Sequence, residues 1–265
     1  MPEDSAEKIP EKTRYFSSVA LRNLSSARML WAGEALGKNR EGLDIWRNVS
    51  EHCLVQTAAC DILAQGLKLP DPSRRNLGLA AMVHDWDKKY ESTGLRKINQ
   101  QIASGEVTEE GGKLKYDFVE ESGKHSIKGM EDKGIPEDII RIASADGHTA
   151  LTRVMKADCS IEEKVLQYVG SITDESNIVL LDQRVDNLEN NERYKMMNEY
   201  GRQVEWTGGR TLYEMQRDVG HQIEQELVKK LLEQGSLSEY WKTRLQKSPR
   251  DLPVFILERL QAQYS

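Results

Sequence analysis

Apolar side chains recur at three- and four-residue intervals along almost the whole chain, and strict alternation of apolar and polar residues is rare. Spacing of this kind places apolar residues on one face of a helix, whereas strands need alternation. We therefore expect an all-α protein.

The first expected helices end where glycine or proline follows. The helix at 17–37 ends at a glycine, and the helix at 48–67 is stopped by a pair of prolines. The third, at 73–90, carries a nearly unbroken apolar stripe, which predicts deep burial. The segment 104–117 is rich in glycine and charge, so we expect a mobile loop there.

Helix signals continue through the second half of the chain. Pro136 precedes a helix with acidic residues in its first turn, and Ser160 with Glu163 forms a capping box for another. Helical spacing then extends over 181–200, over the long segment after a GGRT break, and over 249–264.

Composition excludes several classes of protein. The 265 residues contain 37 Lys and Arg against 43 Asp and Glu, a net charge of −6, and no basic block typical of dedicated nucleic-acid binding. No apolar run approaches the roughly 20 residues of a membrane span, and the first residues lack the apolar centre of a secretory signal. We expect a cytoplasmic protein without membrane contact. Three cysteines without a CxxC pair predict neither a disulfide framework nor a thiolate zinc site.

Four of the five histidines fall in order on the expected helices: His52, His84, His125 and His148. The sharpest feature is LAAMVHDWDK, in which Asp85 directly follows His84 where a buried helix ends. Successive helical side chains point about 100° apart. These two side chains therefore cannot occupy the same coordination position of a metal ion, but they can face two adjacent metal ions. Imidazole and carboxylate ligands suit iron, manganese, zinc or magnesium better than soft metals.

The ordered histidines resemble the ligand pattern of the HD superfamily of metal-dependent phosphohydrolases. NVSEHCLVQTAACDILA and LAAMVHDWDK are similar to its first two signatures, and HSIKGMEDKGIPEDIIRIASADGH is similar to the extra histidine pair of its bimetallic members. Those members include HD-type diadenosine tetraphosphate hydrolases and cyclic-dinucleotide phosphodiesterases. The resemblance implies an HD-domain helical bundle with extra helices at both ends.

The same resemblance divides the chain into an N-terminal helical segment at 1–44, a metal-binding core at 45–185 and a helical extension at 186–265. The extension carries an apolar face around Ile223, which either closes over the core or pairs with a second copy in a homodimer. We expect it to belong to the same globule, because the GGRT break is too short for a linker.

The resemblance further implies a site for one or two divalent metal ions, iron or manganese first, with magnesium, zinc, cobalt and nickel as further candidates. In that pattern Asp85 bridges the two ions. The implied ligands are His52, His84 and Asp85 for one ion, and His125 and His148 for the other.

One position departs from the family pattern. The family usually ends its ligand set with an aspartate, and the matching place in EKVLQYVG is Gly170. Asp174 lies four residues later, on the same face of the expected helix, and is the candidate substitute. Without a carboxylate from either place, one metal position would stay open to water.

The implied reaction is metal-assisted hydrolysis of a phosphorylated small molecule, a nucleotide or a dinucleotide, with Asp85 as the catalytic carboxylate. Lys88 completes HDxxK and resembles the family lysine near the substrate phosphate. Arg184 follows the ligand helix and is a second candidate phosphate contact. Metal-bound histidines also need outer carboxylates, and the acids close in sequence are Glu51, Asp87 and Asp146.

Two alternatives use the same residues. The H, HD, H, H, D arrangement also resembles that of the HD-fold di-iron oxygenases, and a degenerate domain marked by Gly170 would bind a nucleotide or a partner without hydrolysis. His221 has no motif around it, so we expect it on the surface or in ordinary packing.

Overall fold

The computed structural model describes residues 36–38, 44–46, 48–108, 110–156 and 158–264. Most of these residues are helical, which confirms the expected all-α class. The strands among them form two short antiparallel pairs, β1 (Leu36–Lys38) with β2 (Asp44–Trp46) and β3 (Thr173–Asp174) with β4 (Asn177–Ile178). Within the described ranges no helix has the length and apolar character to cross a membrane.

The helices of the first half surround the candidate site. They are α3 (Asn48–Gly66), α4 (Asp71–Val83), α5 (Lys88–Ala103), α6 (Gly111–Asp132) and α7 (Glu137–Ala143). A 3-10 turn η1 (His148–Ala150) and the short α8 (Leu151–Val154) lead into α9 (Ile161–Ile172).

The second half adds α10 (Leu181–Glu189), α11 (Glu192–Tyr200), α12 (Leu212–Gln234), α13 (Glu239–Lys247) and α14 (Leu252–Tyr264). Short 3-10 turns, η2 (Gly201–Gln203), η3 (Glu205–Thr207) and η4 (Pro249–Asp251), join them. The predicted capping box of Ser160 and Glu163 is present at the start of α9, and Thr211 with Glu214 forms another at the start of α12.

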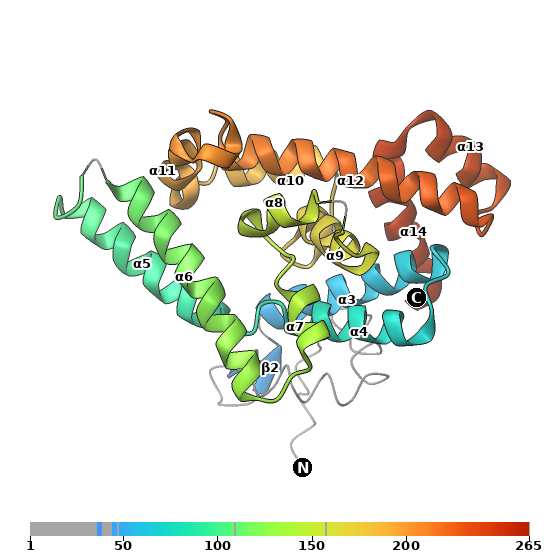
Figure 1. Cartoon of the computed structure of the whole chain (residues 1–265), viewed down its shortest axis with the longest axis horizontal. Helices are drawn as coiled ribbons and strands as arrows, with labels where there is room; N and C mark the ends of the chain where they lie inside the picture. The colour runs from blue at the N-terminus through green and yellow to red at the C-terminus, as the bar shows by residue number, and fades with distance from the viewer. Residues whose placement is uncertain (1–35, 39–43, 47, 109, 157, 265) are drawn as a thin grey trace, which may run out of the picture.

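Helix α3 forms the centre of the core, because α4, α9 and α14 all pack against it. Its side chains Leu54 and Leu63 are completely buried. In Figure 1, α12 runs across α9 and α10, while α5 and α6 form a hairpin that extends to one side and meets α11. The core is therefore built by helices that are far apart in the sequence.

The apolar face of α12 packs inside this chain. Ile223, Leu227 and Leu231 are buried in the same hydrophobic cluster as the residues of α3. Of the two alternatives for this face, closure over the core is the one that the structure shows.

Several expected boundaries are wrong. The helix expected at 17–37 lies mostly outside the described residues, and its last two positions belong to β1, where Gly37 pairs with Ile45. The helix expected at 73–90 is two helices, because the apolar stripe of α4 stops at Val83 and residues 84–87 form a turn before α5.

The segment expected as a mobile loop at 104–117 is helical from Gly111 onward. Its two adjacent glycines serve close packing: a Cβ on Gly112 would overlap the backbone carbonyl of Met196 and lie 3.0 Å from the Tyr200 Cβ. The glycine-rich composition therefore marks a helix–helix contact between α6 and α11.

Candidate metal centre

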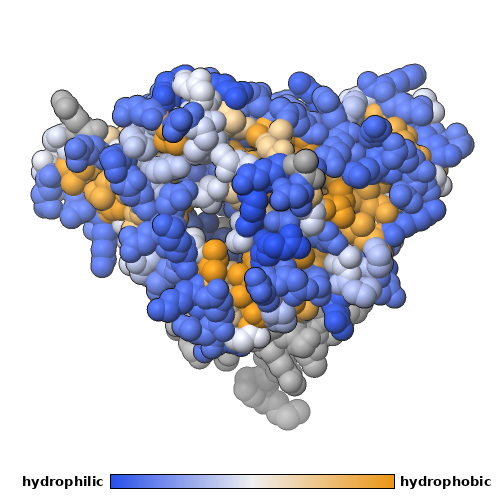
Figure 2. All heavy atoms as spheres, in the orientation of Figure 1, coloured by the Kyte–Doolittle hydropathy of each residue, from blue (hydrophilic) through white to orange (hydrophobic). Residues whose placement is uncertain are grey.

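The candidate site lies in a pocket of about 440 Å³ on one side of the core. The α4–α5 turn, the middle of α6, the loop between α7 and η1, and residues of α9, α10, α11 and α12 line it. In Figure 2 the surface is hollowed between α6 and α8, at the opening of this pocket.

Three of the predicted ligands meet at the floor of the pocket. One ligand atom from each of His52, His84 and Asp85 lies within 4.8 Å of the other two. His52 comes from α3, whereas the other two come from the turn that ends α4. The early end of α4 at Val83 is what allows this meeting, because the turn directs His84 and Asp85 toward α3.

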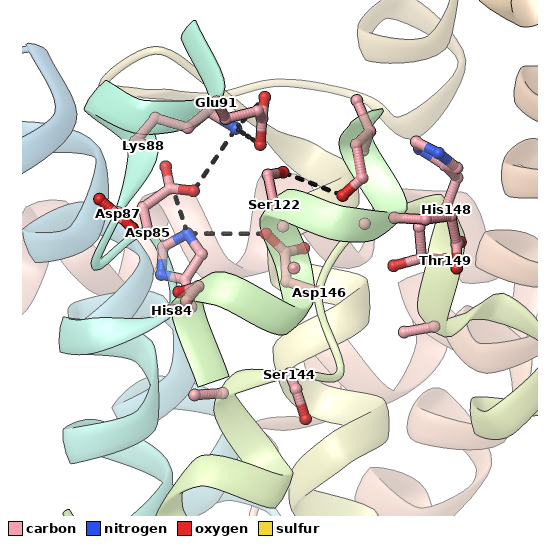
Figure 3. A pocket seen from close by; sticks show the side chains of 18 of the residues that line it. His84, Asp85, Asp87, Lys88, Glu91, Ser122, Ser144, Asp146, His148 and Thr149 are labelled. Atoms are coloured by element: carbon pink, nitrogen blue, oxygen red, sulfur yellow. Dashed lines mark hydrogen bonds and ion pairs between the residues drawn. The ribbon is translucent and has the colours of Figure 1, made fainter. Parts of the chain in front are cut away.

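His84 has the geometry of a metal ligand. Its Nδ1 donates to the carbonyl of Ala81 at 2.9 Å, so Nε2 carries the free lone pair. The side chain is 1% exposed, and Nε2 has no hydrogen-bond partner among the described residues. It lies 3.8 Å from Asp85 Oδ2 and 3.6 Å from Asp146 Oδ2 (Figure 3). A buried, unpartnered imidazole nitrogen that faces carboxylates fits a divalent cation.

His52 is oriented in the same manner. Its Nδ1 donates to the carbonyl of Glu175 at 2.7 Å, in the turn between β3 and β4, and Nε2 accepts from Gln56 Nε2 at 2.8 Å. The rings of His52 and His84 lie 5.4 Å apart. A metal ion on His52 Nε2 would replace the Gln56 hydrogen bond, so Gln56 holds the ring in position when no ion is there.

The electrostatics of the site favour a cation. Burial lowers the pKa of His84, but Asp85 and the neighbouring Cys53 outweigh burial and raise that pKa to about 10. Burial raises the pKa of Asp85, but Lys88 and His84 outweigh it and hold the pKa below the ordinary value, so the carboxylate stays ionised. The field that favours a proton on His84 also favours a metal ion in its place.

Lys88 lies above the three ligands, at the side of the pocket. Its Nζ is 3.5 Å from Asp85 Oδ1 and 3.2 Å from Glu91 Oε1. Burial lowers the pKa of Lys88, but the two carboxylates raise it well above the usual value, so the ammonium is charged. Glu91 was not among the residues predicted from the sequence, although its position one helical turn after Lys88 is a signal for such a pair.

The second predicted histidine pair lies outside this group. His125 is half exposed, hydrogen-bonds to Asp87 and stacks on Tyr90 with the ring centroids 4.3 Å apart. His148 is buried, and Figure 3 shows it on the opposite side of the pocket from His84. The described residues thus bring together three of the predicted ligands, and the two histidines predicted for a second ion are not among them.

His148 faces the pocket as a neutral side chain. Burial and the charge of Lys88 lower its pKa to about 4. Its Nε2 has no hydrogen-bond partner within the described part of the chain. The side chain is therefore available to hydrogen-bond a ligand in the pocket.

Asp174 is not part of the group formed by His52, His84 and Asp85. Helix α9 ends at Ile172, so Asp174 lies in β3 and not one turn further along the helix. Its carboxylate accepts hydrogen bonds from Arg184 and from Asn187. The candidate phosphate contact Arg184 does line the pocket, but its guanidinium is paired with Asp174.

Asp146 takes up the space next to Gly170. A Cβ on Gly170 would overlap Asp146 Oδ1 and would lie 2.9 Å from Asp146 Cγ. Sequence reasoning placed Asp146 beside His148, but the carboxylate points to His84 instead (Figure 3). Of the other expected outer acids, Asp87 contacts His125, and the side chain of Glu51 lies outside the described residues.

Comparisons with known proteins give no relative for this chain. It matches no protein-family model, no curated protein and no solved structure.

Proposed function

We propose that this chain is a metal-dependent phosphohydrolase that acts on a nucleotide or a dinucleotide. The observation that carries the proposal is the meeting of His52, His84 and Asp85 on the floor of a pocket, with the charged Lys88 beside them. The donor set favours iron or manganese, with magnesium, zinc, cobalt and nickel as further candidates. The pocket volume lies in the range of small-molecule sites.

The residues of the chain divide the work between them. His52, His84 and Asp85 would hold the ion, which when bound supplies Lewis-acid chemistry and a bound water of lowered pKa. Glu91 keeps the Lys88 ammonium beside Asp85, where it can balance negative charge on a phosphoryl group. The neutral His148 offers a hydrogen bond to the substrate from the opposite wall.

A phosphate-release screen over nucleotides and dinucleotides, with Mn²⁺ or Fe²⁺ added, tests the proposal. We expect His84→Asn to reduce hydrolysis to background, because it removes a ligand. Lys88→Met should lower kcat/KM by about 10²–10³, as loss of one group that stabilises transition-state charge does. Lys89→Met is the matched control, since Lys89 is exposed and does not line the pocket. A screen negative with every metal would contradict the proposal.

A nucleotide-binding module without catalysis is the second candidate function. Gly170 favours it, because the carboxylate expected there is absent. If the chain is such a module, calorimetry should detect nucleotide binding. Neither the natural chain nor His84→Asn should then release phosphate from the nucleotide. Oxygen consumption by the iron-loaded protein would instead favour the oxygenase alternative, which needs two irons.

The proposal includes a cytoplasmic location and a small phosphorylated molecule as the partner. The free thiols of Cys53, Cys60 and Cys159 suit a reducing compartment. Fractionation followed by immunodetection checks the location.

A further inference from the structure

The space beside Gly170 is filled by a carboxylate from another part of the chain. Gly170 lies in α9, whereas Asp146 comes from the loop between α7 and η1. An ideal Cβ at position 170 would occupy the same space as Asp146 Oδ1. A side chain at 170 and the present position of Asp146 therefore exclude each other.

The carboxylate of Asp146 also has the spacing of a metal ligand. Nitrogen and oxygen ligands lie about 2.0–2.2 Å from an ion such as zinc, so two neighbouring ligands of one ion are about 3–3.5 Å apart. His84 Nε2 lies 3.6 Å from Asp146 Oδ2 and 3.8 Å from Asp85 Oδ2. These separations are slightly wider than those of a filled site, and His84 Nε2 is the buried, unpartnered atom between the two carboxylates.

Three other described acids near the pocket are already paired. Asp174 is held by Arg184 and Asn187, and Glu91 is held by Lys88. Asp87 accepts from His125. By contrast, the Asp146 carboxylate faces the unpartnered Nε2 of His84.

We infer that Asp146 supplies the fourth protein ligand of the metal ion, in the space that Gly170 leaves open. The inference rests on the metal site of the proposed function and adds a ligand to it. The ion would then join α3, the α4–α5 turn and the loop after α7, with two imidazoles and two carboxylates.

Binding of Mn²⁺ alone, measured by isothermal titration calorimetry and by metal content after dialysis, tests this assignment. We expect Asp146→Ala and the isosteric Asp146→Asn to weaken Mn²⁺ binding at least about tenfold, because loss of even an outer partner of a metal ligand costs that much. Asp174→Asn is the matched control, and its Mn²⁺ affinity should equal that of the natural chain.

A relocation variant tests the shared space. Gly170→Asp alone places two carboxylates in overlapping positions, so we expect weaker Mn²⁺ binding and a lower melting temperature. In Asp146→Ala/Gly170→Asp the new carboxylate has room, and Mn²⁺ affinity should recover to within about tenfold of the natural chain. If the double variant binds Mn²⁺ no better than Asp146→Ala does, a carboxylate at position 170 does not take the place of the Asp146 carboxylate, and this part of the inference is overturned.

The assignment would be overturned if both Asp146 variants bound Mn²⁺ as tightly as the natural chain does. Loss of Mn²⁺ binding in Asp174→Asn instead would also overturn it. Thermal unfolding of every variant in EDTA shows whether the metal-free fold is intact, and Asp146→Asn serves if Asp146→Ala does not fold. The Mn²⁺ titration uses no substrate, so it tests the ligand assignment separately from hydrolysis. A natural chain that binds Mn²⁺ but hydrolyses nothing would overturn the proposed function and leave this assignment standing.

Discussion

Glu224 is a carboxylic acid inside the protein, with its side chain only 2% exposed. Tyr168 donates to one of its oxygens at 2.6 Å, and His221 Nδ1 contacts the other at 3.1 Å. His221 Nε2 in turn contacts Asp182 at 3.0 Å. The histidine that the sequence left without a motif thus links α9, α10 and α12 through polar side chains. Burial raises the pKa of Glu224, although Tyr168 and His221 act against the rise.

We expect the free energy of unfolding of Glu224→Gln to rise, relative to the natural chain, as the pH increases above 4.5. The raised pKa means that the folded state holds the Glu224 proton more tightly than the unfolded state, so the natural chain loses stability between 4.5, the ordinary value, and the raised pKa. Glutamine does not ionise and loses none there. Urea unfolding from about pH 4 to about pH 8 measures the difference, and a constant difference would contradict the expectation.

Helix α6 shows how one element uses glycine in two ways. Gly111 and Gly112, at its start, lie against α11, where no larger side chain fits without movement. Gly123 lies further along the same helix, and a Cβ there would meet nothing within 4 Å. Packing requires Gly112, because its neighbour is the backbone of Met196, whereas no contact requires a glycine at position 123, where glycine weakens the helix.

Alanine at these positions should act in opposite directions. Gly112→Ala should destabilise the protein by about 1–3 kcal/mol, because the new Cβ overlaps the Met196 carbonyl. Gly123→Ala should stabilise it by about 0.5–1 kcal/mol, since alanine is the better helix former. Denaturant unfolding measures both, and equal effects of the two substitutions would show that the α6–α11 contact is looser than described.

At the scale of the whole molecule, the candidate metal site joins segments that are distant in sequence. His52 lies on α3, His84 and Asp85 follow α4, and the loop with Asp146 follows α7. These segments also share the hydrophobic core built around α3. Binding of an ion at this site would therefore stabilise the folded state, because the unfolded chain does not bring these residues together.

We expect metal binding to raise the melting temperature and to involve one ion per chain. At free Mn²⁺ about one hundred times Kd the gain is about 2.7 kcal/mol, or about 5–10 °C for a chain of this size. EDTA should reverse the shift, and His84→Asn should abolish it. His125→Asn should keep both the shift and the single ion, because His125 lies outside the ligand group. Two ions per natural chain, with one lost in His125→Asn, would support the two-metal prediction instead.

The local pattern of this sequence determined the helical class, the position of α3, the capping box of α9 and the adjacent pair His84 and Asp85. These features depend on neighbours within one or two helical turns, so period and capping residues predict them. Tertiary structure alone decided that Asp146 fills the space beside Gly170 and that His125 and His148 lie apart from the metal group. Side chains on different helices meet or separate according to where each helix ends and how the helices cross. The spacing of residues along the sequence specifies neither the exact helix ends nor the angles at which the helices cross.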